Sequence, residues 1–232
     1  MNKIISMSVW GNDPRYIIGA KRQVELAKKY YSEWEVRIYT DNPDNFINTE
    51  AVIIPVKENT SGYFWRFEPL FESENNIVLV RDSDGRITIR ERRATREWEE
   101  SDKQFHIFRD HEAHFEFPII ACAFGNKGKL SNVLYEKMNW FKNNTSYYTN
   151  DQVFLKDYVY DEIKNNVMIH SMNDIGWFKN SRELLCNPYS FCGNGFDEND
   201  MPLYPNTLKE CKNFNRFSLD VKYKFDEGIL NY

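Results

Sequence analysis

Two carboxylates separated by a single serine, Asp82 and Asp84, lie just beyond the run 76–80 (NIVLV), with Arg81 between. At this spacing, on a loop that leaves a strand, both can reach one hard divalent cation that prefers oxygen ligands. A turn followed by a helix cap would use the same residue types, and a D-x-D pair alone does not separate the two interpretations. The preceding buried strand favours the metal site.

Several arginines follow or precede this pair. Arg66, Arg86 and Arg90 could neutralise phosphate groups through charge-assisted hydrogen bonds. The run 90–100 (RERRATREWEE), however, has the Glu–Arg spacing of a solvated helix with i,i+4 ion pairs. We therefore expect most charges of this run to lie at the surface.

Two residues of the second half could complete a site. His170 follows the short apolar run 166–169, where a histidine is either a structural group or a ligand that suits Mn²⁺. Asp151 lies at the start of a predicted helix, where an acid interacts favourably with the helix dipole. A catalytic carboxylate is the alternative role for Asp151.

The segment 105–115 (FHIFRDHEAHF) holds three of the chain's 4 histidines. His111 and His114 could share a helical face and bind zinc together with Asp110. The H-E-x-x-H pattern and a clear further ligand are missing, so a polar network near the pocket is the favoured interpretation. There is also no CxxC pair, glycine-rich dinucleotide motif, Walker A motif or nucleophile elbow.

The elements that position these residues alternate between strand and helix in the first half. Strands are predicted at 3–9, 35–40, 51–56 and 76–80, with a helix that starts at Asn12–Pro14 and runs to Tyr31. The segment 63–71 is predicted to be helical up to Glu68, because Pro69 disfavours helix at the residue before it. This alternation predicts a mixed, mainly parallel sheet flanked by helices, with ligands bound at the carboxyl ends of its strands.

The second half is less regular. A strand is predicted at 117–125, helices at 130–141 and 149–159, and a short strand at 166–170. Because no linker, repeat or low-complexity tract interrupts the chain, we expect one domain over residues 1–232.

Composition excludes some classes of protein. The chain of 232 residues is 41% hydrophobic, enough for a substantial core, and its net charge of −5 argues against nucleic-acid binding through a basic surface. No stretch approaches the roughly 20 apolar residues of a membrane-spanning helix. The N-terminus lacks the pattern of a signal peptide, so we expect a cytoplasmic protein.

Together these features resemble the GT-A glycosyltransferases, and most closely a group of small bacterial and large-DNA-virus glycosyltransferases. The resemblance rests on the words YFWRFEPL, VRDSDGR, FHIFRDHEAH, DQVFL and GNGFDEND, in that order. It implies a single GT-A-like, Rossmann-related domain. Residues 1–100 would bind a nucleotide-sugar and residues 101–232 the acceptor.

The resemblance also implies roles for individual residues. Asp82 and Asp84 would hold Mn²⁺ or Mg²⁺ against the donor diphosphate, with Asp84 the more direct ligand, and His170 would complete the metal site. Asp151 would face the acceptor, as the general base if the reaction inverts the sugar. The nucleobase would be cradled by the N-terminal strand and helix, near Ser8, Trp10 and Tyr16.

The leading hypothesis is therefore a metal-dependent glycosyltransferase that uses a nucleotide-sugar, with UDP as the expected nucleotide, to build a surface polysaccharide or glycoconjugate. A metal-dependent nucleotidyl- or phosphoryltransferase is the first alternative, although no glycine-rich phosphate loop follows the first strand. A non-catalytic carbohydrate-binding relative is the second. The motifs do not choose between a retaining and an inverting reaction.

Overall fold

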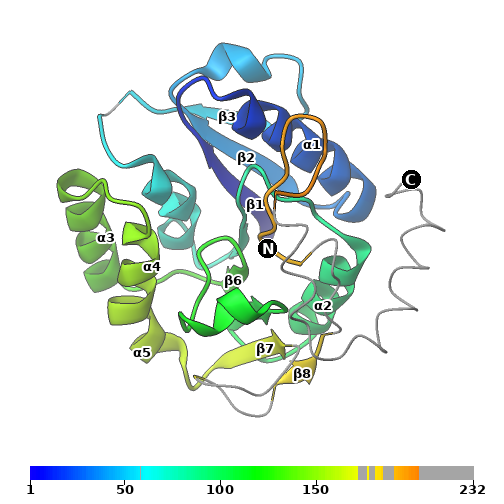
Figure 1. Ribbon diagram of the computed structural model, residues 1–232. Coiled ribbons are helices and arrows are strands. Elements are labelled where there is room, and N and C mark those ends of the chain that lie inside the picture. The colour runs from blue at the N-terminus through cyan, green and yellow to red at the C-terminus, as the bar shows by residue number, and fades with distance from the viewer. Residues whose placement is uncertain (58, 172–176, 178–180, 185–190, 204–232) are drawn as a thin grey trace.

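The computed structural model describes residues 1–57, 59–171, 177, 181–184 and 191–203 (Figure 1). Eight strands form one sheet in the order β3-β2-β1-β4-β6-β5-β7-β8. They are β1 (Asn2–Val9), β2 (Glu35–Thr40), β3 (Val52–Pro55), β4 (Asn76–Val80), β5 (Phe105–Arg109), β6 (Phe124–Lys127), β7 (Val167–Ser171) and β8 (Arg182–Glu183). Only β6 among them runs antiparallel to its neighbours, β4 and β5.

The helices are α1 (Pro14–Tyr30), α2 (Ile89–Glu99), α3 (Asn132–Asn144), α4 (Asn150–Phe154) and α5 (Tyr160–Ile163). A π-helical turn, Leu155–Val159, joins α4 to α5. The segments η1 (Pro43–Phe46), η2 (Gly62–Phe71) and η3 (Glu112–Phe115) are 3₁₀ helices. The three long helices begin at side-chain caps, from Asp13, Thr88 and Ser131, which satisfy backbone N–H groups that have no partner within the helix.

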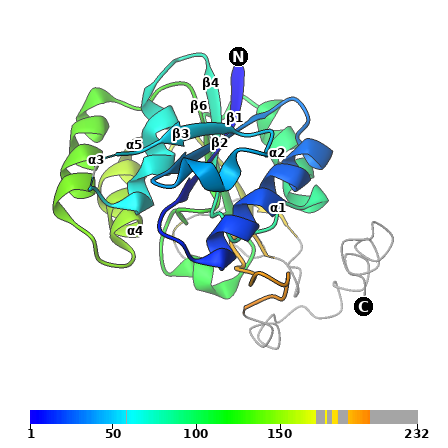
Figure 2. The same cartoon turned by 90° about the horizontal axis from the view of Figure 1, so that it is seen from above.

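Helices cover both faces of the sheet, as the view from above shows (Figure 2). Strand β1 explains the layering, because its successive side chains point to opposite faces. Ile4 packs with η2, α3 and α4 in one apolar cluster, whereas Ile5 and Met7 pack with α1 in another. The carboxyl ends of β1 and β4 therefore lie between two well-packed layers.

The predicted fold class, a single α/β domain with a mixed, mainly parallel sheet flanked by helices, is confirmed, and the finer GT-A assignment remains a prediction. Strands β1 and β4 are parallel neighbours, and the strand predicted at 35–40 has those bounds. The assignment of residues 1–100 and 101–232 to donor and acceptor remains a prediction.

Two local predictions were wrong. The apolar run 117–125 is a strand only from Phe124 onward, because such a run indicates burial and not a particular backbone. Inside it, the N–H of Ala121 donates to the side chain of Gln152 (3.3 Å) and not to another strand. The helical segment at Pro69 also continues to Phe71, since it is a 3₁₀ helix whose φ angles suit proline.

Most charges of the run 90–100 lie at the surface, as its spacing predicted, but two of them do not. Arg90 and Glu91 are buried on α2. Arg90 forms an ion pair with Asp110, and the carboxylate of Glu91 lies 3.4 Å from Nε of Arg81. Buried charges of this kind need partners, and neither partner is visible in the i,i+4 pattern.

In the part of the chain that the structure describes, none of the helices combines the length and apolar character needed to cross a bilayer.

Candidate active site

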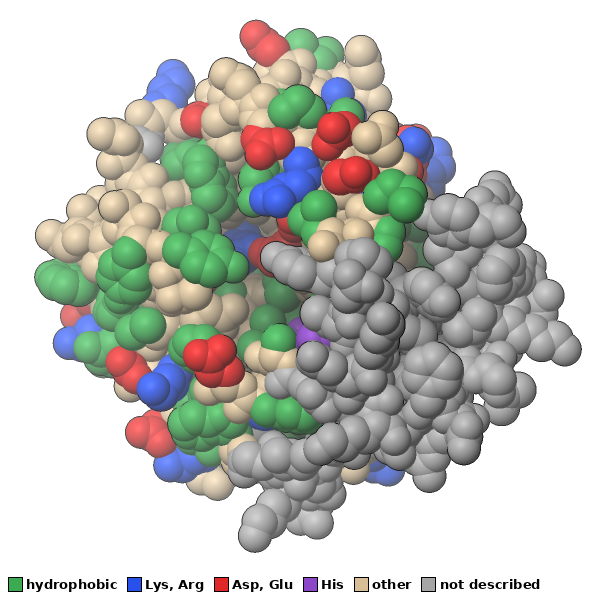
Figure 3. Space-filling view, viewed as in Figure 1, with side chains coloured by type: hydrophobic (Ala, Val, Ile, Leu, Met, Phe, Trp, Pro, Cys, Tyr) green, Lys and Arg blue, Asp and Glu red, His purple; other side chains and the backbone are tan. Residues whose placement is uncertain are grey.

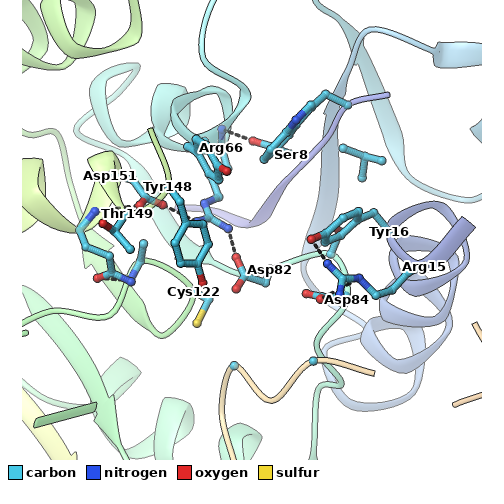
Figure 4. A pocket seen from close by; sticks show the side chains of 18 of the residues that line it. Ser8, Arg15, Tyr16, Arg66, Asp82, Asp84, Cys122, Tyr148, Thr149 and Asp151 are labelled. Atoms are coloured by element: carbon cyan, nitrogen blue, oxygen red, sulfur yellow. Dashed lines mark hydrogen bonds and ion pairs between the residues drawn. The ribbon is translucent and has the colours of Figure 1, made fainter. Parts of the chain in front are cut away.

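A pocket of about 290 Å³ opens at the carboxyl ends of β1 and β4, bordered by α1 and α4 (Figure 4). Figure 3 shows acidic and basic side chains around the hollow on this face of the molecule. Most of the predicted site residues line the pocket, namely Ser8, Trp10, Tyr16, Arg66, Asp82, Asp84 and Asp151. Segments far apart in the sequence thus meet where parallel α/β sheets bind ligands.

The loop that carries Asp82 and Asp84 is held from α1. The side chain of Gln23 donates to the carbonyl of Asp82 (3.0 Å) and accepts from the N–H of Ile87 (2.9 Å), so it clamps both ends of the loop. Gly19 permits the close approach, because a Cβ there would lie 2.5 Å from the carbonyl oxygen of Ser83. The loop does form a turn before α2, and these contacts hold its two carboxylates at the pocket.

The two carboxylates repel each other at this position. Burial, and then the charge of Asp82, raises the pKa of Asp84 to about 6, although Arg15 and Arg86 oppose the shift. Nε of Arg15 lies 3.6 Å from the Asp84 carboxylate. A bound cation would relieve this repulsion.

Arg66 joins the two sides of the pocket. Its guanidinium pairs with Asp82 and also donates to Oδ2 of Asp151 (2.8 Å). The backbone of Arg66 is fixed by β1, because Ser6 Oγ donates to its carbonyl (2.7 Å) and its N–H donates to Ser8 Oγ (2.8 Å). Ser8 therefore lines the pocket, but its hydroxyl holds the Arg66 backbone.

Asp151 lies on the opposite side from Asp84, in the first turn of α4. The preceding Thr149 has a left-handed backbone (φ 74°), which turns the chain into the helix. Burial raises the pKa of Asp151, and the nearby positive charge of Arg66 opposes this shift. A buried carboxylate with a raised pKa is a stronger base than an exposed one.

The predicted nucleobase residues Trp10 and Tyr16 lie in different surroundings. The Trp10 ring packs over Gly62 and lies 4.9 Å from the ring of Tyr63, centroid to centroid. The guanidinium of Arg15 stacks on the ring of Tyr16, 4.1 Å from its centroid. Both residues line the pocket, and their contact with a nucleobase remains a prediction.

Arg86 does not line the pocket. It forms an ion pair with Asp200 (2.8 Å) and donates to the carbonyls of Asp84 (3.0 Å) and Gly85 (2.6 Å). Arg86 therefore stabilises the loop that carries Asp82 and Asp84 from outside the pocket.

The structure does not bring His170 together with Asp82 and Asp84. On β7, its Nδ1 lies 2.8 Å from Nε2 of His106, and its own Nε2 lies 3.1 Å from the carboxylate of Glu97. Both ring nitrogens thus have partners outside the pocket. Its expected part in the metal site came from the resemblance alone, and its position gives that role no support.

His111 and His114 belong to a buried polar network around Asp110, at the end of β5. His111 caps η3 by accepting from the N–H of Ala113 (3.1 Å). Nδ1 of His114 lies 3.4 Å from Asp110, which also accepts from the N–H of Cys192 (3.0 Å). This is the polar network that was favoured over zinc.

The burial of His114 predicts a pH effect on stability. Burial lowers its pKa to about 4, so the folded protein keeps it neutral while the unfolded chain takes up a proton below about pH 6.5. Stability from this group is therefore lost as the pH falls. Relative to His114→Asn, the wild type should lose about 1 kcal/mol of unfolding free energy between about pH 7.5 and about pH 5.5. Urea unfolding of both proteins at the two pH values measures this, and parallel profiles would contradict it.

The chemistry of the donor set fits a divalent cation. Asp82 and Asp84 offer carboxylate oxygens to the pocket, and Mg²⁺ or Mn²⁺ is commonly held by one or two carboxylates together with substrate phosphates and water. Among the described residues, no group of three or more His, Cys, Asp or Glu side chains is placed to hold a metal alone. With Asp82 and Asp84 as ligands, water and the substrate's phosphate oxygens could complete the coordination of such an ion.

Some residues of the pocket were missed from the sequence, namely Arg15, Tyr63, Cys122, Tyr148, Thr149 and Gln152. Arg15 gave a signal, since it follows the proline that opens the first helix. Cys122 lies in the run wrongly predicted to be a strand. Tyr148 gave no signal in the sequence, because an aromatic residue in a polar loop does not indicate which residues it will contact.

Among solved structures, the fold is similar to that of a glycosyltransferase involved in the glycosylation of the major capsid of PBCV-1. The TM-score is 0.46, with 14% identity over 74% of this chain and 82% of that one. It is also similar to the bifunctional IspDF from Campylobacter jejuni, with a TM-score of 0.42 and 10% identity over 80% of this chain and 52% of that one. This chain thus spans about half the length of the latter protein.

No family model and no curated protein sequence matches the chain. Structural similarity at this level does not identify an activity, so any function must be argued from the pocket itself.

Proposed function

We propose that this protein is a glycosyltransferase that moves a sugar from a nucleotide-sugar to a hydroxyl group of a glycan or glycoconjugate. The observation that carries the proposal is the placement of Asp82 and Asp84 across one pocket from Asp151, with Arg66 between them. One side has the groups to bind a metal diphosphate, and the other has a buried base.

On the donor side, negative charge develops on the diphosphate as the glycosyl bond breaks. Asp82 and Asp84 would hold Mn²⁺ or Mg²⁺, which supplies positive charge to the leaving group when it is bound. Arg15 and Arg66 add two guanidinium groups that line the same pocket. We expect a UDP-sugar as donor, with Trp10 and Tyr16 available to contact the base.

On the acceptor side, Asp151 is the proposed general base of an inverting transfer. The acceptor oxygen forms a bond to the anomeric carbon, while the bond from that carbon to the diphosphate oxygen breaks and its electron pair leaves with the diphosphate. The hydroxyl proton passes to the carboxylate of Asp151. The raised pKa of Asp151 suits this role.

Nucleotidyl transfer is the second candidate, because it would use the same pair of metal-binding carboxylates. A helix N-terminus is a common phosphate-binding site in proteins that bind nucleotides. In this protein the N-terminus of α1, directly after β1, is occupied by the carboxylate of Asp13, which accepts from the N–H of Arg15 (2.9 Å). That contact disfavours a phosphate at this helix and ranks glycosyl transfer first.

Incubation with a panel of nucleotide-sugars and of nucleoside triphosphates, with Mn²⁺ or with EDTA, separates the candidates. Glycosyl transfer or donor hydrolysis releases a nucleoside diphosphate from a nucleotide-sugar. Nucleotidyl transfer releases pyrophosphate from a triphosphate instead. A protein that binds sugars but releases neither product would be a non-catalytic relative, and the proposal would then be wrong.

The shared position of Arg66 predicts that lysine cannot replace it. Arg66→Lys keeps one positive charge but loses the fork that reaches both Asp82 and Asp151. Losing one buried charge-assisted hydrogen bond should cost about 1.5–3 kcal/mol of unfolding free energy. Urea denaturation measures this cost.

The matched control is Arg96→Lys. Arg96 forms an exposed i,i+4 pair with Glu100, and such pairs contribute under about 1 kcal/mol. If the two variants lose the same unfolding free energy, the contacts of Arg66 with Asp82 and Asp151 contribute no more than an exposed ion pair, and the prediction is wrong.

A further inference from the structure

Two tyrosines form an aromatic corner on the Asp151 side of the pocket. The rings of Tyr63 and Tyr148, which we call the aromatic corner, lie 6.5 Å apart at an angle of 72°. Both residues line the pocket, and Tyr148 is nonetheless 79% exposed. Most of the Tyr148 side chain is thus in contact with solvent where it borders the pocket.

The corner is held in place by buried contacts. Asn150, which is fully buried, donates to Ser61 Oγ (3.2 Å) and to Thr145 Oγ1 (2.9 Å). Ser61 directly precedes η2, which carries Tyr63, and Asn150 follows Tyr148 by two residues. The same side chain therefore fixes the two segments that carry the corner.

The backbone beside Tyr148 is also constrained. Thr149 has a positive φ of 74°, a conformation that costs energy in a residue other than glycine and persists only where the surroundings enforce it. Such strain is often found at binding sites. Here it accompanies a well-anchored loop.

The corner lies next to the proposed base. Asp151 follows Tyr148 by three residues, and Figure 4 shows both on the side of the pocket opposite Tyr16, Arg15 and Asp84. The charge of Asp151, after burial, raises the pKa of Tyr63, which places the Tyr63 hydroxyl within the electrostatic reach of that carboxylate.

We infer that the aromatic corner binds the ring of the acceptor, and that this acceptor is a sugar. A pyranoside can lay its apolar C–H face on the ring of Tyr148, and its hydroxyl groups then reach Tyr63 and Asp151. Tyrosine suits this task because it combines a large apolar face with a polar end. The inference deepens the proposed function, since it names the class of acceptor: a glycan, and not a serine or threonine of a peptide.

Direct binding tests the subsite without turnover. Saturation-transfer NMR is carried out with methyl β-D-galactopyranoside, methyl α-D-glucopyranoside and methyl α-D-mannopyranoside. It should detect binding of at least one of these glycosides and no binding of N-acetyl-serinamide. Tyr148→Ala should weaken the glycoside's affinity by about tenfold, equivalent to about 1.4 kcal/mol. Tyr148→Phe should retain it, because stacking uses the ring.

Tyr147→Ala is the matched control. Tyr147 is the adjacent tyrosine and is 50% exposed, but it does not line the pocket. Its replacement should leave the affinity unchanged. Absence of binding to all three glycosides, equal affinity of Tyr148→Ala and wild type, or a preference for the serine compound would each overturn the inference.

Kinetics separates this inference from the proposed function. With an active donor, Tyr148→Ala should raise the KM for the sugar acceptor by about tenfold more than the KM for the donor. If donors turn over and the acceptor KM does not change, the subsite is wrong while the function stands. If glycosides bind through Tyr148 but no donor is ever consumed, the subsite stands and the function is wrong.

Discussion

Replacement of Asp84 by asparagine is expected to abolish metal-dependent donor binding and turnover. The variant keeps nearly the same shape but removes one of the two negative charges offered to the cation. A cation held by Asp82 alone is bound less tightly, so less positive charge is kept beside the diphosphate, and we expect a loss of several kcal/mol of transition-state stabilisation. Calorimetric titration of UDP with and without Mn²⁺, followed by turnover with the active donor, measures both effects.

The stability of the same variant gives an independent readout. Burial and the charge of Asp82 disfavour the ionised form of Asp84, as its raised pKa of about 6 indicates. Removing that charge should leave the metal-free fold at least as stable as the wild type near neutral pH. Lost activity together with an unchanged or higher melting temperature would separate a functional residue from a structural one.

The matched control for Asp84 is Asp161→Asn, at an exposed aspartate that pairs with Lys164 on the surface. It should retain wild-type binding and turnover. Full activity of the wild type in excess EDTA, with Asp84→Asn equally active, would refute the metal assignment.

The elements around the first half of the sheet could be predicted because their signals are local. Strand β4 is apolar from Ile77 to Val80 and buried along its whole length, and α1 begins with a capping aspartate and a proline. Once those elements were assigned, the rule for parallel sheets placed Asp82 and Asp84 at the binding edge. This part of the site therefore followed from pattern and topology.

What could not be predicted depends on contacts between distant segments. Arg90 and Glu91 have the spacing of surface charges, and only their pairing with Asp110 and Arg81 makes burial possible. His170 lies one residue before the end of β7, at the expected edge, but its side chain faces His106 and Glu97. The end of a strand can be located from sequence more easily than the direction in which a side chain near that end points.

Asp151→Asn is expected to keep the fold and the donor affinity but to reduce turnover by about 10² to 10⁴. The amide is nearly isosteric with the carboxylate, and its oxygen can still accept the hydrogen bond that Arg66 donates to Oδ2. It loses the hydrogen bond that the N–H of Gln152 donates to Oδ1 (2.8 Å), and it can no longer take up the proton of the acceptor hydroxyl. Steady-state turnover with the active donor, together with UDP affinity and the melting temperature, distinguishes these effects.

The control is Asp157→Asn, at an exposed aspartate on the same run of helical turns, which should behave as the wild type. Two outcomes would remove the catalytic role of Asp151. If the asparagine variant turns over as fast as the wild type, the carboxylate only stabilises the first turn of α4. If the variant fails to fold, the ion pair with Arg66 is structural, because its charge, and not only its hydrogen bond, is then needed to bury that arginine.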